Sequence, residues 1–250
     1  MQIMLRYERK YLVPNYLLND LRNRIRGFVR EDIYATANGK GLPEYTVRSI
    51  YFDSPDLINY HEKHAGLKHR RKLRVRSYNK FAPEKEVVLE IKRKLENRVR
   101  KHRSSVSYGN LDKLLESGRV EAYLDLSHSK NPARSLEDAR RFFFHYKLKP
   151  FLPTTLVTYE REAYHGKLNA GTRITFDKNI RSKNYPSLDE LFSEENMRYL
   201  FKDHCIMEIK YFDDEMPGWA KGIVQEFRLR HEALSKYVIG YDVNKSFAHY

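Results

Sequence analysis

The sequence predicts an α+β fold in which an antiparallel sheet of about eight strands carries helices between its strands and at the C-terminus. Three observations predict this fold. Several segments alternate polar and apolar residues with the period of two that strands show. Stretches with apolar residues at helical spacing lie between and after them. The 250 residues suit one large domain or two small ones and contain no internal repeat, and we expect a single domain over residues 1–250.

The N-terminal elements follow from local patterns. Residues 3–13 alternate between two faces, which predicts a strand. Residues 15–29 place six apolar side chains at helical spacing with arginines opposite, which predicts an amphipathic helix. Residues 45–52 are β-branched and aromatic, as strands prefer. Ser54 and Pro55 suit the N-cap and first position of a short helix. The chain therefore begins as strand, helix, strand, helix.

The middle of the chain predicts three more strands and two helices. Residues 69–80, HRRKLRVRSYNK, alternate cations with Leu and Val, and residues 86–95 alternate Glu and Lys with apolar residues. Residues 98–107 continue as a strand beyond a turn. Asn110 is a capping residue and predicts a short helix after it. The segment LEDARRFFFHYKL, residues 136–148, predicts the next helix.

The C-terminal part predicts three further strands and a final helix. The strands are expected at residues 154–164, 172–180 and 204–212, each rich in β-branched and aromatic side chains. A last amphipathic helix is expected to begin near Pro217 and to include Leu234. An antiparallel sheet with one polar and one apolar face can close into a barrel with a polar interior, and the helices would then cover its outside.

Composition restricts the class of protein. An aromatic content of 13% indicates a folded chain, because disordered chains are poor in aromatic residues. The net charge of +14 attracts polyanions such as nucleic acid, nucleotides, inorganic phosphates or an anionic membrane surface. The single cysteine, Cys205, excludes a disulfide framework and a thiolate metal cluster. The charged N-terminus does not resemble a signal peptide and no apolar run suits a membrane helix, so we expect a cytoplasmic protein.

Charged residues recur on one face of several predicted strands. Three strands carry the pattern E-x-K, and residues 69–80 place four cations on one face. These residues are Glu8 and Lys10, Glu90 with Lys92 and Lys94, Glu208 and Lys210, and Arg70, Lys72, Arg74 and Arg76. One interpretation is a solvated sheet face with cross-strand salt bridges. The other is the interior of a barrel, and the residues alone leave the two interpretations about equally open.

The chemistry of these side chains favours the second interpretation. A closed charged interior is costly unless a ligand neutralises it, and phosphates can do so through charge-assisted hydrogen bonds from Arg and Lys. Carboxylates among the cations suit Mg²⁺ or Mn²⁺, which bind a few carboxylates together with substrate phosphates. Cations with a metal are typical of phosphoryl transfer. No P-loop pattern is present, and HEKH at residues 61–64, which is not H-E-x-x-H, suits the solvated end of a helix.

Eight motifs now support a resemblance to a known family. They are YERKYLV, SIYFDSPDLINY, KLRVRSY, LEIKRK, TYEREAY, RITFDKNI, MEIKY and SKYVIG, in this order from about residue 4 to about residue 240. The order resembles the VTC domain, the catalytic domain of the vacuolar transporter chaperone polyphosphate polymerase, within the CYTH or triphosphate tunnel metalloenzyme superfamily. The resemblance implies an antiparallel β-barrel tunnel lined by basic residues and carboxylates. It therefore implies that the charged faces point inward.

The resemblance also implies roles for individual residues. The cofactor is expected to be Mn²⁺ or Mg²⁺ on Glu208, helped by Glu8 or Glu90. The residues expected to act in catalysis are Glu208, Arg74, Arg76 and Lys236. The residues expected to bind phosphate are Lys10, Arg74, Arg76, Lys92, Lys101, Arg103, Tyr159, Arg161, Arg173, Lys210 and Lys236. Tyr7, Tyr11 and Tyr51 are expected in the core.

The expected activity is transfer of the γ-phosphate of ATP to a growing polyphosphate chain. The alternatives are hydrolysis of a triphosphate or polyphosphate, and a module that binds polyphosphate or a nucleotide without turnover. Where the wider superfamily opens with E-x-E-x-K, this chain has Arg6 in place of the first Glu, which argues against a two-metal triphosphatase. RNA binding on an open basic sheet is a weaker alternative.

The expected ligands are ATP, polyphosphate or another triphosphate, and no stable complex with nucleic acid is expected. The eukaryotic polymerases fuse this domain to other domains and to membrane helices. Because no such segment occurs in this sequence, coupling to a membrane would need a membrane-protein partner at its inner, cytoplasmic face.

Overall fold

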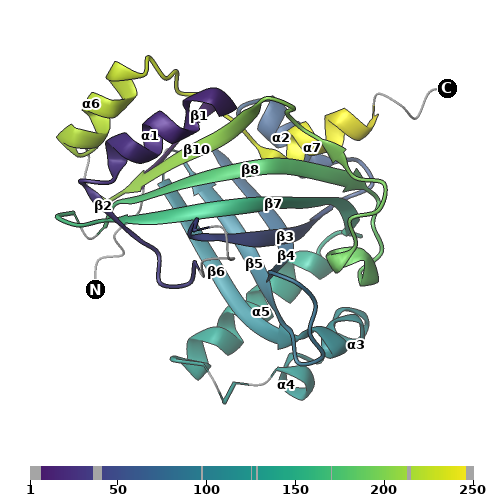
Figure 1. The fold of residues 1–250 in the computed structure, drawn as a ribbon. Coiled ribbons are helices and arrows are strands. Elements are labelled where there is room, and N and C mark those ends of the chain that lie inside the picture. Colours follow the sequence, from purple (N-terminus) through teal and green to yellow (C-terminus); the bar gives the residue numbers. More distant parts are fainter. Residues whose placement is uncertain are drawn as a thin grey trace.

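The computed structural model describes residues 7–35, 41–96, 98–124, 126–127, 129–169, 171–212 and 215–245. Within them, strands form one antiparallel sheet with the order β1-β10-β8-β7-β3-β4-β5-β6, while β2 pairs with β7 and β9 with β8 (Figure 1). The predicted α+β fold with helices outside an antiparallel sheet and a helix near the C-terminus is confirmed. The described residues contain no helix long and apolar enough to cross a bilayer.

All eight predicted strands are present, and two short strands, β2 and β9, were not predicted. The strands are β1 (Tyr7–Pro14), β2 (Val29–Glu31), β3 (Glu44–Asp53), β4 (His69–Tyr78), β5 (Glu86–Leu95), β6 (Arg98–Ser107), β7 (Leu152–Gly166), β8 (Arg173–Asn184), β9 (Arg198–Tyr199) and β10 (His204–Tyr211). The α-helices are α1 (Leu18–Ile25), α2 (Ile58–His64), α3 (Leu111–Ser117), α4 (Val120–Tyr123), α5 (Pro132–Lys147), α6 (Gly218–Glu226) and α7 (Lys236–Lys245).

The sheet curls into a barrel that is not strictly closed. Its two edge strands, β1 and β6, contact each other, but in the described part of the chain no backbone ladder joins them. A side chain spans the gap instead, because Lys92 of β5 places Nζ 3.0 Å from Oε1 of Glu8 on β1. We call this line between β1 and β6 the seam. The predicted antiparallel barrel is therefore present, but its sheet is not strictly closed.

Apolar side chains point outward from the barrel and pack beneath helices. Leu73 and Val75 of β4 are fully buried in one core with Phe142 of α5, and Phe52 meets Phe142 edge to face at 6.3 Å between ring centroids. Figure 1 shows α3, α4 and α5 on this side and α1 with α6 beside β1 and β10. Burying each such side chain gains about 1.5–3 kcal/mol, which fixes the strand register and turns the alternate cations inward.

Three predicted helix boundaries are wrong. The helix expected over residues 15–29 is shorter, because α1 ends at Ile25 and Val29 begins the strand β2. The last helix does not continue from Pro217 through Leu234, because α6 ends at Glu226 and α7 begins at Lys236. The segment between them instead lies against β1, where the Glu232 N–H donates to the Lys10 carbonyl at 2.9 Å. This tertiary contact replaces the helical hydrogen bonds that the apolar spacing predicted.

Helix α2 also begins later than the Ser54 and Pro55 pattern predicted. Its first residue is Ile58, and Leu57 before it has a left-handed φ of 52°. Two side chains cap it: the Asp53 carboxylate accepts from the N–H groups of Asn59 and Tyr60, both at 3.0 Å, and Ser54 Oγ accepts from the Ile58 N–H at 3.2 Å.

Candidate functional site

The barrel interior contains a cavity of about 390 Å³ that is lined mainly by cations. Thirteen Lys and Arg side chains and three Glu side chains line it, so the described lining carries a large excess of positive charge. The cations are Arg9, Lys10, Lys63, Arg70, Lys72, Arg74, Arg76, Lys92, Lys94, Lys101, Arg161, Lys210 and Lys236. The charged strand faces therefore point inward, as the resemblance implied.

One side of the cavity has matched charges, and we call it the balanced wall: Glu8, Lys10, Glu208 and Lys210. Strands β1 and β10 are antiparallel neighbours that place Glu8 opposite Lys210 and Lys10 opposite Glu208. Lys10 Nζ lies 3.2 Å from Glu8 Oε1, and Lys210 Nζ lies 2.8 Å from Glu208 Oε2. Two E-x-K strands side by side thus produce a checkerboard of opposite charges.

The balanced wall keeps its two carboxylates ionised. Burial and the nearby Glu208 would raise the pKa of Glu8, but the ammonium groups of Lys92, Lys10 and Lys210 lower it to about 2. Burial would likewise raise the pKa of Glu208, and Lys210, Lys10 and Arg161 hold it well below its usual value. Burial lowers the pKa of Lys210 to about 8 despite the two carboxylates. Both carboxylates are therefore charged at neutral pH.

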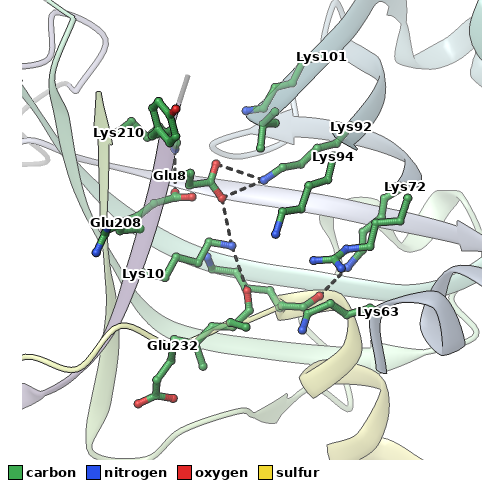
Figure 2. A pocket seen from close by; sticks show the side chains of 18 of the residues that line it. Glu8, Lys10, Lys63, Lys72, Lys92, Lys94, Lys101, Glu208, Lys210 and Glu232 are labelled. Atoms are coloured by element: carbon green, nitrogen blue, oxygen red, sulfur yellow. Dashed lines mark hydrogen bonds and ion pairs between the residues drawn. The ribbon is translucent and has the colours of Figure 1, made fainter. Parts of the chain in front are cut away.

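The other side carries a group of cations that we call the cationic wall: Lys63 of α2, Arg70 and Lys72 of β4, and Lys94 of β5. None of these four pairs with an acidic side chain among the described residues. Lys72 Nζ donates to Ser235 Oγ at 2.6 Å. Figure 2 shows Lys63 and Lys72 across the cavity from Glu208 and Lys210.

The cations of this wall destabilise one another. Burial and the charges of Lys10, Lys92, Arg70 and Lys63 hold the pKa of Lys72 well below its usual value. Burial and the neighbouring cations also lower the pKa of Lys94. A bound anion would relieve both effects, because it would supply the counter-charge that the protein lacks here.

Two buried arginines of β4 lie beside the walls. Arg74 donates through Nη1 to Tyr51 Oη at 2.9 Å and forms a short ion pair with Glu90, while Arg76 donates through Nε to Ser49 Oγ at 2.9 Å. Burial would raise the pKa of Tyr51, but Arg74 and Arg76 lower it to about 8. The local field thus favours negative charge at this hydroxyl.

The remaining cavity cations are Arg9 of β1, Lys92 of β5, Lys101 of β6, Arg161 of β7 and Lys236 of α7. Arg161 forms a bidentate pair with Asp177 of β8 at 2.6 and 2.7 Å, and its Nη2 lies 3.5 Å from Glu208 Oε2. Lys236, the first residue of α7, reaches Asp177 Oδ2 at 2.5 Å. Lys101 forms no ion pair in the described structure, and burial holds its pKa well below the usual value.

Eleven of the fourteen predicted site residues line this one cavity. They are Glu8, Lys10, Arg74, Arg76, Lys92, Lys101, Tyr159, Arg161, Glu208, Lys210 and Lys236. The other three do not line it. Glu90 is buried between Arg74 and Arg103, and the Arg103 Nε donates to it at 2.9 Å. Arg173 donates to Asp32 Oδ2 at 2.8 Å and to Tyr45 Oη at 2.9 Å.

Sequence reasoning missed several lining residues. Tyr11 and Tyr51 are buried in core clusters and Tyr7 packs against one, as expected, but Tyr7 and Tyr51 also line the cavity. Lys63 lines it too, although HEKH suggested a solvated helix end. The segment from His231 to Ser235 also lines the cavity, but the sequence pattern predicted a helix in this region and did not indicate a site there. Arg6, on which the comparison with two-metal enzymes depended, lies outside the described residues.

The donor set fits a divalent cation that completes its ligands with phosphate. Glu8 and Glu208 are ionised oxygen donors on the same wall, and Mg²⁺ or Mn²⁺ commonly binds through one or two carboxylates plus substrate oxygens. The described residues contain no group of three or more acidic, His or Cys side chains that could hold a metal ion alone. Glu90, the third predicted ligand, has its oxygens turned towards Arg74 and Arg103.

Comparison with known proteins identifies one family. The family described as the VTC domain matches residues 5–245. No curated protein matches the chain significantly.

Three solved structures are similar to the chain at low identity. A putative adenylyl cyclase from Hippeastrum with a dominant triphosphatase activity is 14% identical, with a TM-score of 0.46 over 96% of this chain and 97% of that chain. The PH1819 protein of Pyrococcus horikoshii OT3 is 13% identical, with a TM-score of 0.44 over 92% and 94%. The capping enzyme triphosphatase of mimivirus is 9% identical, with a TM-score of 0.31 over 88% of both chains.

Proposed function

We propose that this chain, which belongs to the VTC domain family, catalyses phosphoryl transfer on a triphosphate or polyphosphate held in its cavity. The most specific form of the proposal is a polyphosphate polymerase. A terminal oxygen of the polyphosphate chain attacks the γ-phosphorus of ATP, the bond from that phosphorus to the bridging oxygen breaks, and ADP leaves. One observation carries the proposal: thirteen cations and three Glu residues surround a single cavity.

The arginines of the cavity would hold the phosphates. Guanidinium groups bind phosphate oxygens through two parallel hydrogen bonds, and Arg74, Arg76 and Arg161 are buried in the wall. Phosphoryl transfer needs little covalent help from a protein, since positioning and charge stabilisation lower most of the barrier. No side-chain nucleophile is required, and the cations would stabilise the negative charge that develops on the leaving ADP.

Glu8 and Glu208 would hold the Mn²⁺ or Mg²⁺ ion that we expect. When bound, such an ion supplies charge neutralisation between phosphate oxygens. Lys10 and Lys210 neutralise the same two carboxylates in the absence of a metal. Their ammonium groups can turn towards phosphate oxygens, because a lysine is a flexible point charge.

A second candidate function is binding without turnover. It is favoured by the ion pairs of Glu8 and Glu208 with lysines and by the lack of a third carboxylate on the balanced wall. Such a module would hold polyphosphate or a nucleotide as a passive ligand. Hydrolysis, in which water replaces the polyphosphate oxygen as the attacking group, uses the same residues as the polymerase.

The deciding experiment is product analysis with ATP and either Mn²⁺ or Mg²⁺. We expect ADP and polyphosphate from the wild type and a loss of at least about 100-fold in Glu208→Gln. Glu226→Gln is the matched control, because Glu226 is half-exposed and pairs with Arg24 on the outer surface. ADP with inorganic phosphate alone would indicate a hydrolase. Tight tripolyphosphate binding by calorimetry without any product would indicate the binding module, and equal activity in both variants would refute the assigned site.

A further inference from the structure

We propose that Asp177 is a positioning residue, which fixes the two cations Arg161 and Lys236 at the orientation that the reaction needs. Asp177 does not line the cavity, so it would act through these two side chains. The kinetic consequence rests on the proposed phosphoryl transfer. The structural part, that Asp177 holds the two cations, can be tested separately.

Asp177 binds the guanidinium of Arg161 with both carboxylate oxygens. Strand β8 lies between β7 and β10, and its Asp177 is opposite Arg161 on one side and Ile206 on the other. Arg161 donates through Nε to Oδ1 at 2.6 Å and through Nη2 to Oδ2 at 2.7 Å. Asp177 is fully buried. A planar bidentate pair out of contact with water leaves the guanidinium little rotational freedom.

The same carboxylate holds the first residue of α7. Lys236 Nζ lies 2.5 Å from Asp177 Oδ2 and 4.8 Å from the centroid of the Tyr159 ring, over which Arg161 also lies at 5.2 Å. A lysine in the first turn of a helix is unfavourable, because the helix dipole is positive there. Asp177 supplies the negative charge that makes this position acceptable.

Helix α7 does not depend on Asp177 for its attachment. Tyr237 donates to Asp53 Oδ2 at 2.5 Å, Ser182 donates to the Gly240 carbonyl at 3.0 Å, and Asn184 donates to the Tyr241 carbonyl at 3.0 Å. Removing the Asp177 carboxylate should therefore leave the helix in place. What changes is the position of the Arg161 and Lys236 side-chain ends, of which Arg161 Nη2 lies 3.5 Å from Glu208 Oε2.

Charge and orientation then give opposite expectations for binding and turnover. Asp177→Asn adds one net positive charge beside the cavity, so the affinity for tripolyphosphate should be unchanged or higher. Turnover should fall by about tenfold to 100-fold, since displacing a catalytic group by about 1 Å can cost that much. A residue with only a structural role would weaken both together.

The test has a spectroscopic arm and a kinetic arm. The Arg161 Nε–H resonance is assigned by its loss in Arg161→Lys, and its exchange with solvent is measured without any ligand. We expect slow exchange in the wild type and in Asp53→Asn, and fast exchange in Asp177→Asn. Asp53→Asn is the matched control, because Asp53 is equally buried and binds α7 but touches neither cavity cation. Slow exchange in Asp177→Asn would overturn the proposal.

The kinetic arm compares kcat for ATP with the tripolyphosphate affinity in the same variants. A fall in kcat with retained affinity supports the proposal, and an unchanged kcat or a parallel loss of affinity overturns it. Asp177→Glu replaces Asp177→Asn if the latter does not fold, and the same split with a smaller fall in kcat is expected. If the wild type yields no product, the proposed function fails, while the exchange measurement still decides whether Asp177 holds Arg161.

Discussion

The balanced wall and the cationic wall are built from the same residue types, yet they treat charge in opposite ways. On the balanced wall, Glu8 and Glu208 share their lysines, so the ion pairs are complete without any ligand. On the cationic wall, Lys63, Lys72 and Lys94 have no acidic partner among the described residues. The two walls therefore differ in their electrostatics. The carboxylates of the balanced wall are neutralised by lysines, whereas the cations of the cationic wall lack a counter-charge that a bound anion would supply.

The largest expected loss of turnover is that of Glu8→Gln, on the balanced wall. It removes one of the two ionised carboxylates and leaves Lys10 and Lys92 without their partner, so turnover should fall by about 100-fold. Tripolyphosphate affinity should rise or stay the same, because the cavity gains positive charge. The matched variant Lys94→Gln on the cationic wall should change turnover by less than about threefold. Equal losses of turnover in the two variants would show that the walls do not differ in function.

Lys72→Gln, on the cationic wall, should weaken anion binding. Lys72 should contribute about 1.4 kcal/mol to anion binding, so tripolyphosphate affinity should fall about tenfold in calorimetry. The unliganded protein should become more stable, because an uncompensated cation is removed. About 1 kcal/mol would raise the Tm by about 2–4 °C.

Lys80→Gln is the control for this variant, since Lys80 is exposed on the turn after β4. It should change neither quantity. A lower Tm in Lys72→Gln would mean that Lys72 stabilises the fold through its hydrogen bond to Ser235, and that its charge does not destabilise the protein without a bound anion.

The smallest expected effect is a tyrosine titration. The pKa of Tyr51, about 8, lies below its usual value of 10.0, so the unfolded state binds more protons between these values and stability should rise with pH there. Tyr159, by contrast, has its pKa raised to about 12, mainly by burial, with Asp177 adding to the effect. Burial would raise the pKa of Tyr78, but Arg76 and Arg103 lower it below its usual value. The ultraviolet absorbance of tyrosinate should therefore show an early component that is smaller, by one tyrosine, in Tyr51→Phe.

Tripolyphosphate should move that component to higher pH, because a bound anion opposes a second negative charge. An early component of unchanged size in Tyr51→Phe would assign the shifted pKa to Tyr78 or another tyrosine. It would also remove Tyr51 as a reporter of the cation excess near Arg74 and Arg76.

The sequence predicted the parts of this molecule that depend on strand alternation. Residues such as Arg74 and Leu73 occupy opposite faces wherever a strand packs an apolar face, so parity alone placed Lys10, Lys92 and Lys210 together on the charged faces. Whether those faces point inward was decided by the family resemblance, because a solvated sheet has the same alternation.

The features that were missed depend on partners distant in the sequence. Glu90 carries the same E-x-K pattern as Glu8, but a neighbouring strand brings Arg103 against it, and no local pattern records that. Asp177 shares the parity of Arg173 and could have been noticed on this ground, yet its role depends on Lys236, which lies 59 positions further along the chain. The break between α6 and α7 follows from a contact with β1 that helical spacing does not encode.

The seam gives this barrel a mechanical property that a closed ring lacks. The main path of backbone ladders runs from β1 through β10 and β4 to β6, and β2 and β9 pair with β7 and β8 off this path. Among the described residues no ladder joins β1 to β6, and the contact of Lys92 with Glu8 bridges that gap by side chains. The circumference can therefore widen without the loss of a single ladder hydrogen bond. Widening the gap would break the ion pair of Lys92 with Glu8, and the phosphates of a bound anion would then bind the released ammonium group. Because of the seam, a bound anion could change the diameter of the barrel.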